Sequence, residues 1–137
     1  MYLLDTNILI DFSRGKLPYA YELMQRSDAS LFKVPAIVKS ELLLGAAKSR
    51  WPEEMRLRVE SLLLPFEILP FDDACSYHYA RIRAKLESEG MTIGANDYLI
   101  AATALSHSAV LVTNNVKDFK RIPELFIESW KEVDFHG

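Results

Sequence analysis

The chain is predicted to form an α/β domain in which a central, mostly parallel, five-stranded sheet lies between two layers of helices. Short apolar segments bounded by polar or turn residues alternate along the 137 residues with longer segments of helical periodicity. One short segment, residues 109–112, is apolar without alternation, which is typical of a strand covered on both faces. Strands separated by helices pair in parallel. We therefore expect a three-layer α/β/α domain.

Each expected strand is short, apolar and ended by polar or turn residues, and the expected helices fill the intervals. The strands are residues 1–4, 30–34, 66–69, 109–113 and 125–128. The helices are residues 7–13, 18–27, 37–48, 52–63, 72–89 and 95–107, with a short turn at 118–121. The prolines occur between these elements or at the first position of an expected helix, and no repeat or linker divides the chain. A single domain covering residues 1–137 is expected.

The composition excludes several classes of protein. The single cysteine, Cys75, cannot form an intrachain disulfide, which fits a reducing cytoplasm. No segment approaches the roughly 20 apolar residues of a membrane span, and no basic leader opens the chain, so a cytoplasmic protein without a membrane partner is expected. The net charge of −3 argues against a passive nucleic-acid binder, although bound cations would let an acidic site hold phosphate.

Asp5 directly follows the first apolar segment. Ligands gather beyond the carboxyl ends of strands in open α/β sheets, so an acid at this place is a candidate site residue. An Asp there can also be no more than an N-cap for the next helix. Right-handed crossovers bring the carboxyl ends of parallel strands to one edge of the sheet. We therefore expect Asp5 near residues 113–115, which follow another strand.

Two further acids stand at unusual places in helices. At 100° per residue, Glu41 falls between Ile37 and Leu44 on the apolar stripe of its helix. It is there either a functional carboxylate or an ion-paired residue at the edge of the stripe. Asp97 opens the helix of residues 95–107, which is apolar on nearly all sides and therefore predicted to be buried. A helix N-terminus also favours such an acid without any function.

The segment that follows residue 112 carries more polar side chains. Thr113, Asn115 and Asp118 could supply oxygen ligands or hold metal-bound water, although each alone is commonly a turn or capping residue. Acids without a His or Cys cluster suit Mg²⁺ or Mn²⁺ better than zinc. Because such a cation can position water for in-line attack on phosphorus, phosphodiester hydrolysis is the predicted chemistry.

Four segments together carry a family resemblance. They are Asp5-Thr6-Asn7-Ile8-Leu9-Ile10-Asp11, Ser40-Glu41-Leu42 with Gly45, Ile93-Gly94-Ala95-Asn96-Asp97 with Ile100-Ala101-Ala102-Thr103-Ala104, and Val112-Thr113-Asn114-Asn115 with Asp118-Phe119, Arg121, Ile122 and Pro123. In this order and spacing they resemble the PIN-domain ribonucleases, specifically the VapC toxins of toxin-antitoxin pairs. The resemblance covers the chain from residue 1 to residue 130 or so.

The resemblance implies a magnesium-dependent endoribonuclease, with manganese able to replace magnesium, that forms a homodimer and is inhibited by a VapB-like antitoxin. The metal-binding and catalytic acids would be Asp5, Glu41 and Asp97, with Asp118 as a fourth catalytic acid. The side chains that hydrogen-bond to the acids would be Thr6, Asn7, Thr113 and Asn115. Family members carry the fourth acid at the position of either Asn115 or Asp118, so that place stays open. Lys117, Lys120 and Arg121 are predicted contacts for RNA phosphates.

Two other functions compete with this interpretation. A degenerate PIN domain would bind RNA or protein without cutting, but all three principal acids are present. A phosphatase could use Asp5 as nucleophile, but Asn7 stands where the second acid of such enzymes is usual. The large apolar residues Trp51, Met55 and those at 62–64 are expected in the core, with an intermolecular interface as the alternative.

Overall fold

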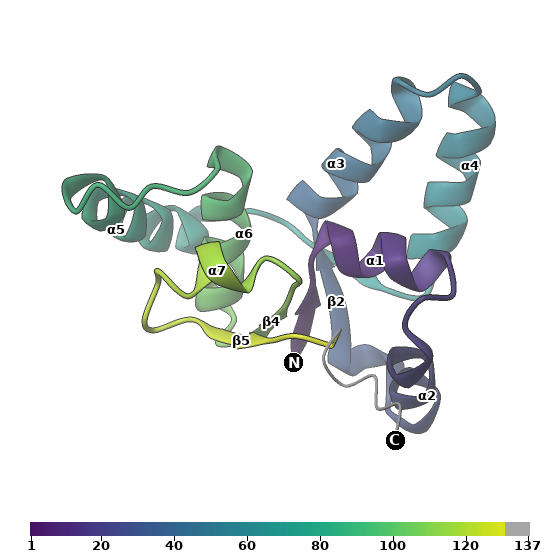
Figure 1. Ribbon diagram of the computed structural model, residues 1–137, viewed down its shortest axis with the longest axis horizontal. Helices are drawn as coiled ribbons and strands as arrows, with labels where there is room; N and C mark the ends of the chain where they lie inside the picture. The colour runs from purple at the N-terminus through teal and green to yellow at the C-terminus, as the bar shows by residue number, and fades with distance from the viewer. Residues whose placement is uncertain (131–137) are drawn as a thin grey trace.

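Figure 1 shows the computed structural model, whose sheet has five parallel strands in the order β3-β2-β1-β4-β5. The structure describes residues 1–130, apart from the side chains of residues 19–21. The strands are β1 (Tyr2–Leu4), β2 (Phe32–Pro35), β3 (Glu67–Leu69), β4 (Val110–Val112) and β5 (Phe126–Glu128). Every neighbouring pair is parallel. The predicted fold class is confirmed, and the sheet described here is parallel throughout.

Helices fill the connections between the strands. They are α1 (Thr6–Ser13), α2 (Pro18–Arg26), α3 (Ala36–Ala47), α4 (Pro52–Leu63), α5 (Asp73–Ser88), α6 (Ala95–Ser106) and α7 (Val116–Phe119). From β1 the chain steps outward to β2 and β3, then crosses back to β4 and β5 on the other side of β1. Right-handed crossovers in opposite directions place helices on both faces of the sheet. The reversal makes the boundary between β1 and β4 the topological switch point, where α/β proteins commonly bind ligands.

The core contains most of α6 and an aromatic cluster that includes the first residues of β1 and β2. In α6, six residues from Tyr98 to Ala104 are buried, which confirms the predicted buried helix. The ring of Tyr2 stacks on that of its register partner Phe32, with 5.4 Å between centroids, and the buried Trp130 meets Phe32 edge-on at 5.9 Å. This aromatic cluster lies where β1 and β2 begin. Polar side chains gather where β1 and β4 end.

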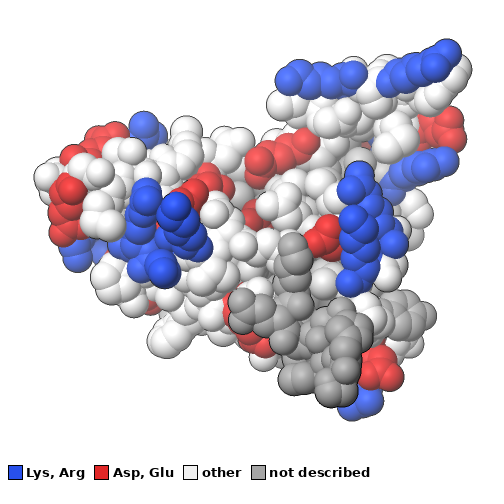
Figure 2. Space-filling view, viewed as in Figure 1, with Lys and Arg blue, Asp and Glu red and all other residues white. Residues whose placement is uncertain are grey.

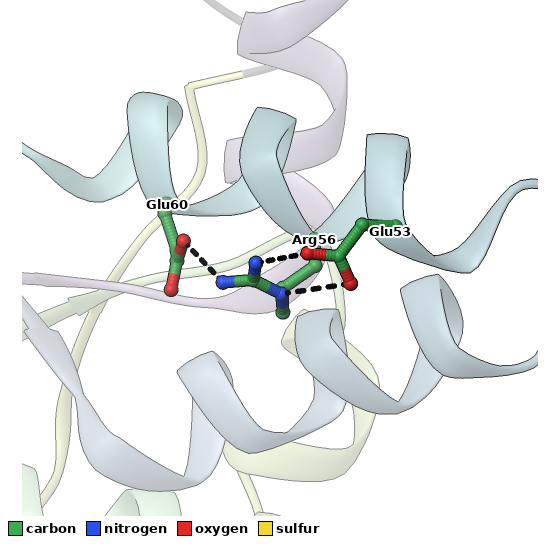
Figure 3. A network of polar contacts seen from close by, with 3 residues as sticks. All are labelled: Glu53, Arg56 and Glu60. Carbon is green, nitrogen blue, oxygen red and sulfur yellow. Dashed lines mark hydrogen bonds and ion pairs between the residues drawn. The ribbon is translucent and has the colours of Figure 1, made fainter.

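Helices α3 and α4 form a hairpin that projects from the rest of the molecule in Figure 1. On α4, Arg56 forms ion pairs with both Glu53 and Glu60, the latter at 2.7 Å (Figure 3). Arg58 pairs with Glu54 at 3.1 Å. Pairs at these spacings support a helix that has one side in solvent, although each contributes little because water screens it. Among residues 1–130, no helix is both long and apolar enough to cross a membrane.

Two predicted elements begin two residues away from their observed starts, and the other elements agree to within one residue at each end. The strand expected at residues 30–34 begins only at Phe32, because the Asp28 carboxylate accepts a hydrogen bond from the Ser30 amide at 2.9 Å and holds Ala29–Leu31 in a 3₁₀ turn. The short helix expected from Asp118 begins two residues earlier, at Val116. Both errors arose where a local side-chain bond or a short turn determines the backbone, and apolar periodicity does not report such bonds.

The predicted environment of the helical hairpin was also partly wrong. In α3 the buried residues are Val38, Leu42 and Ala46, whereas Leu44, expected beside Glu41 on the apolar stripe, is 55% exposed. Glu41 therefore stands at the edge of the buried face and not within it. In the second helix, Leu63 is buried as expected. By contrast, Trp51 is 60% exposed and residue 64 is 84% exposed, so core packing does not account for them.

Candidate active site

The site begins where the ends of β1 and β4 meet. The amide of Asp5 donates to the carbonyl of Val112 at 3.0 Å, which extends the β1–β4 pairing by one residue. The Asp5 carboxylate then accepts from Thr113 Oγ1 at 2.7 Å through Oδ2, and from the Thr6 amide at 2.8 Å through Oδ1. Asp5 is 5% exposed, and Thr113 is fully buried. The predicted meeting of Asp5 with the end of the fourth strand is confirmed.

Asp5 is both the N-cap of α1 and part of a polar cleft. Burial raises the pKa of its carboxyl, and the hydrogen bonds from Thr113 and Thr6 oppose that rise. Each carboxylate oxygen accepts one of these bonds and has further lone-pair capacity. The two predicted roles, cap and site residue, are thus compatible in one side chain.

Thr6 joins Asp5 to the next acid. Its amide bonds to Asp5, and its hydroxyl donates to Glu41 Oε1 at 2.9 Å. Glu41 comes from α3 and is half-buried. It lines the cleft on the side opposite β4. The first residue of α1 therefore orients two carboxylates that are 36 positions apart in the sequence.

Asn115 performs the same task on the other side. Its side-chain amide donates to Asp97 Oδ2 at 3.4 Å and to Asp118 Oδ2 at 3.2 Å, while its backbone amide donates to Thr113 Oγ1 at 2.9 Å. Asn115 therefore connects the first turn of α6 with α7 and with the end of β4. Its side-chain nitrogen is the donor to both acids. Asp118 does not line the cleft, and its negative charge acts on Asp97 from the other side of this amide.

Asp97 is the acid whose protonation is most perturbed. Burial, followed in order of size by repulsion from the carboxylates of Asp5, Glu41 and Asp118, raises its pKa from the ordinary value of 3.8 to about 6. Three other acids thus lie close enough to repel a negative charge on Asp97. Perturbed acids in a cleft are commonly functional, because a bound cation or proton relieves the repulsion.

These residues surround a cleft of about 380 Å³. It is lined by Asp5, Thr6, Asn7, Glu41, Asp97, Asn114 and Asn115. Of the predicted acids and their predicted hydrogen-bonding partners, Thr113 and Asp118 are not among the lining residues, and each acts on the cleft through a hydrogen-bonded neighbour. The cleft thus gathers the residue after β1 with residues from α1, α3, α6 and the segment after β4.

The sequence interpretation missed two contributors. Asn114 lines the cleft, and its amide donates to Asp11 Oδ2 at 3.0 Å. This bond ties the end of β4 to α1 a second time, one helical turn beyond Thr6. The Asn114 Oδ1 atom is buried without a hydrogen-bond partner. The available signal is the pair of adjacent asparagines after the fourth strand, of which only Asn115 is a predicted site residue.

The donor set is compatible with magnesium, though not as a cage of three acids. Within residues 1–130, no group of three or more His, Cys, Asp or Glu side chains is arranged so that it could hold a metal ion. Magnesium does not require such a group, because it usually keeps several waters and binds one or two carboxylates together with phosphate oxygens. Asp5 and Asp97, with Glu41 opposite, are oxygen donors of the required kind around one cleft. The mutual repulsion at Asp97 gives a cation a favourable position there.

Positive side chains flank this acidic centre. In Figure 2 they gather over the region of α7 on one side and over α1 and the α3–α4 hairpin on the other. Lys117 and Lys120 are exposed, as an RNA contact would require. Arg121 is half-buried, and its guanidinium donates to the Thr92 carbonyl at 2.7 Å. The third member of the predicted basic cluster therefore already has a partner within the protein.

A second hollow, of about 690 Å³, opens beside the cleft and shares Thr6 and Glu41 with it. It runs between α1, α3 and α4. Its further lining residues are Ile10, Ser13, Arg14, Leu42, Gly45, Ala46, Met55, Arg58, Val59 and Leu62. The hollow is thus a largely apolar groove with two arginines, and Glu41 is the acid that it shares with the cleft. Met55 and Leu62, for which core and interface were both considered, face this groove.

Comparison with known proteins identifies the class. The PIN domain family matches residues 2–125. The chain is 39% identical over 134 residues to Ribonuclease VapC2 of Rickettsia felis, a match that covers 95% of this chain and 98% of that protein. It is 35% identical over 129 residues to the tRNA(fMet)-specific endonuclease VapC of Salmonella typhimurium, with 94% and 97% covered. The chain therefore belongs to the PIN domain family and, within it, to the VapC proteins.

A solved structure agrees with this assignment. The crystal structure of VapBC2 from Rickettsia felis, bound to a DNA fragment from its promoter, contains a chain that matches with a TM-score of 0.85. The two chains are 37% identical, and the match covers 94% of this chain and 98% of that one. Sequence and fold thus point to the same family, as the resemblance of the four segments had predicted.

Proposed function

We propose that this protein is a cytoplasmic, magnesium-dependent endoribonuclease and the toxin of a toxin-antitoxin pair. The observation that carries the proposal is the convergence of Asp5, Glu41 and Asp97 on one cleft at the switch point of the sheet. The names of its relatives support the proposal, because they are ribonucleases and an endonuclease of the VapC group. All three acids expected of an active member are present, which disfavours a degenerate, purely binding domain.

In this proposal Asp5 and Asp97 would be the principal residues that hold the cation, with Glu41 as the third acid of the site. When bound, magnesium would activate water and stabilise negative charge on the phosphate. The protein holds the acids in place. Thr113 and Thr6 fix the Asp5 carboxylate, Thr6 fixes Glu41, and an amide donor fixes Asp97. Because the acids are oriented before substrate binds, little reorganisation is needed during the reaction.

The decisive experiment is cleavage of total cellular RNA, with and without magnesium, by the wild type and by Asp5→Asn and Asp97→Asn. We expect magnesium-dependent fragments from the wild type and loss of cleavage in both variants. Asp73→Asn is a matched control, because Asp73 also lies in the first turn of a helix but is exposed. Equal cleavage by wild type and both variants would refute the site. If no RNA were cut under any condition, the binding module would be favoured instead.

The same experiment identifies the substrate. One relative is named for specificity toward tRNA(fMet). We propose transfer RNA as the first substrate class to examine for this chain, and mapping the fragment ends on total RNA would show whether transfer, ribosomal or messenger RNA is cut. Manganese should replace magnesium in the assay, because both are octahedral cations that prefer oxygen ligands.

We further propose that a VapB-like antitoxin binds the groove between α1, α3 and α4. An apolar peptide face with an acidic residue for Arg14 or Arg58 would match the lining. A peptide in this groove would end at Glu41 and so could block the cleft. Val59→Glu should weaken co-purification with the cognate antitoxin while RNA cleavage persists, because Val59 lines the groove but not the cleft. Unchanged co-purification would place the antitoxin elsewhere.

We also propose a homodimer. Large apolar residues are exposed on the helical hairpin, with Leu44 and Leu57 each 55% exposed. Such residues in number usually mark an interface. Light scattering should give twice the mass of 15.7 kDa, and Leu44→Glu should shift it toward the monomer. A monomeric wild type would contradict the proposal.

A further inference from the structure

Arg121 differs from its basic neighbours in what it touches. Its Nη1 atom donates to the carbonyl of Thr92 at 2.7 Å, and its backbone amide donates to the carbonyl of Asp118 at 3.1 Å. The residue therefore connects the end of α7 with a segment 29 positions earlier in the chain. Lys117 and Lys120 extend from the same short helix but are exposed.

The segment that Arg121 holds is the connection into α6. Within it, the Ile93 amide donates to the hydroxyl of Tyr98 at 3.2 Å, so the connection is fastened to the first turns of its own helix. Tyr98 is 1% exposed, and the guanidinium of Arg83 lies over its ring at 5.1 Å from the centroid. The connection and the start of α6 thus form one hydrogen-bonded unit, and this unit carries Asp97.

Among the residues that the structure describes, two side-chain hydrogen bonds join this unit to residues 115–121. One is the bond from Arg121 to Thr92. The other is the bridge formed by the Asn115 amide, at 3.4 Å to Asp97 and 3.2 Å to Asp118, distances at the long end for a hydrogen bond. Two acids of like charge face each other across this junction, so electrostatic repulsion acts to open it. The shorter bond, outside the cleft, resists that opening.

We propose that Arg121 is a positioning residue: by holding the Thr92 carbonyl it sets the distance between Asp97 and Asp118, and it does not contact RNA phosphate. The inference rests on the proposed nuclease function. It divides the predicted basic cluster into two parts with different roles. Lys117 and Lys120 remain candidates for binding RNA, whereas Arg121 acts on the reaction through the acids.

Three variants at this position separate the hydrogen bond from the charge. Arg121→Met removes both, Arg121→Gln keeps a donor without charge, and Arg121→Lys keeps a donor and the charge. In Arg121→Met we expect kcat to fall by about 10- to 100-fold with KM unchanged, because a displacement on the order of 1 Å can cost that much. Both Gln and Lys should recover part of kcat. Equal losses in Gln and Met, or a raised KM with normal kcat, would overturn the proposal.

Salt dependence gives an independent readout. RNA binding is measured in an Asp5→Asn background, where cleavage is expected to be lost. The slope of log affinity against log salt should stay unchanged in Arg121→Met, whereas a lost phosphate contact would reduce it by about 0.7. Lys120→Met is the comparison, because that exposed cation is a predicted phosphate contact and should reduce the slope. A reduced slope in Arg121→Met would assign the residue to RNA.

Arg81→Met serves as the matched control. Arg81 also joins two segments of this region, through an ion pair with Glu124 at 2.6 Å, but it does not touch the connection into α6. Its kcat should equal that of the wild type. Thermal unfolding of each variant checks that the chain is folded. If the wild type cuts no RNA, the proposed function fails; if it does and Arg121→Met cuts at the same rate, only the positioning role fails.

Discussion

Replacing Asp97 by Asn should make the metal-free protein more stable at neutral pH, although it should abolish cleavage. Asp97 is negatively charged at pH 7 in a half-buried place that already faces three other carboxylates. The substitution removes the charge and keeps an oxygen that can accept from the Asn115 amide. The acid to which we assign metal binding is therefore expected to reduce the stability of the fold when no metal is bound.

The size of the effect follows from the pKa of Asp97. A rise from 3.8 to about 6 corresponds to an upper limit of about 3 kcal/mol, since one pKa unit is about 1.4 kcal/mol. The carboxyl is only half-buried, so solvent screening reduces the expected gain to about 1–1.5 kcal/mol. For a chain of this length, such a gain raises the unfolding midpoint by roughly 3–6 °C.

The pH dependence has a definite sign. Between pH 3.8 and about 6 the folded protein retains a proton on Asp97 that the unfolded chain releases. The wild type therefore loses stability as the pH rises through this window, and the full deficit is present at pH 7. Below pH 3.8 the carboxyl is neutral in both states. The difference between Asp97→Asn and wild type should thus disappear near pH 4.

Urea denaturation in EDTA at pH 7 and pH 4 measures this difference. Asp73→Asn is the control, because Asp73 occupies the first turn of α5 and is exposed. It should show no gain, and a small loss of about 0.3–1 kcal/mol is expected because the acid favours the helix N-terminus. The reasoning is refuted if Asp97→Asn is no more stable than wild type at pH 7, or if its advantage is the same at pH 4.

Three further outcomes are expected. Magnesium at 100 times its Kd should stabilise the wild type by about 2.7 kcal/mol and so raise its unfolding temperature, but not that of Asp5→Asn or Asp97→Asn. Equal shifts of the three proteins in a thermal scan would place the cation elsewhere. The double variant Lys117→Met/Lys120→Met should bind RNA more weakly, with a salt slope lower by about 1.4, and an unchanged slope in filter binding would exclude both lysines. Thr113→Val should cost about 1–3 kcal/mol in urea denaturation, because the buried Asp5 oxygen loses its donor. Thr113→Ser should retain most of that stability, and equal losses in the two variants would show that the hydroxyl is not responsible.

The sequence predicted the large-scale arrangement because that arrangement follows from general rules. Alternation of strands and helices led to the parallel sheet, and the handedness of crossovers placed Asp5 beside Thr113. The burial of α6 followed from its apolar composition alone. These features depend on many residues at once, so no single side-chain contact could overturn them.

Features that depend on one contact were not predictable. The sequence predicts Glu41 within the apolar stripe of α3, but in the structure it lies at the edge of the buried face. The packing of α1 and α4 against α3 determines which side of that helix is buried. The bond between Asn114 and Asp11 joins residues 103 positions apart and leaves no periodic trace. The partner of Arg121 is a backbone carbonyl, to which any residue type could contribute.

The bond between Thr113 and Asp5 spans 108 positions of the chain. During synthesis, β1 leaves the ribosome long before β4 exists, and Asp5 then has no hydroxyl to orient it and no Asp97 or Asn115 beside it. On the proposed function, a nascent or prematurely terminated chain that lacks the segment after β4 has an incomplete centre and cannot cut RNA. On that function, activity would arise only when nearly the whole chain has been made, whereas the residues of the groove proposed for an antitoxin, all between Thr6 and Leu62, are made much earlier.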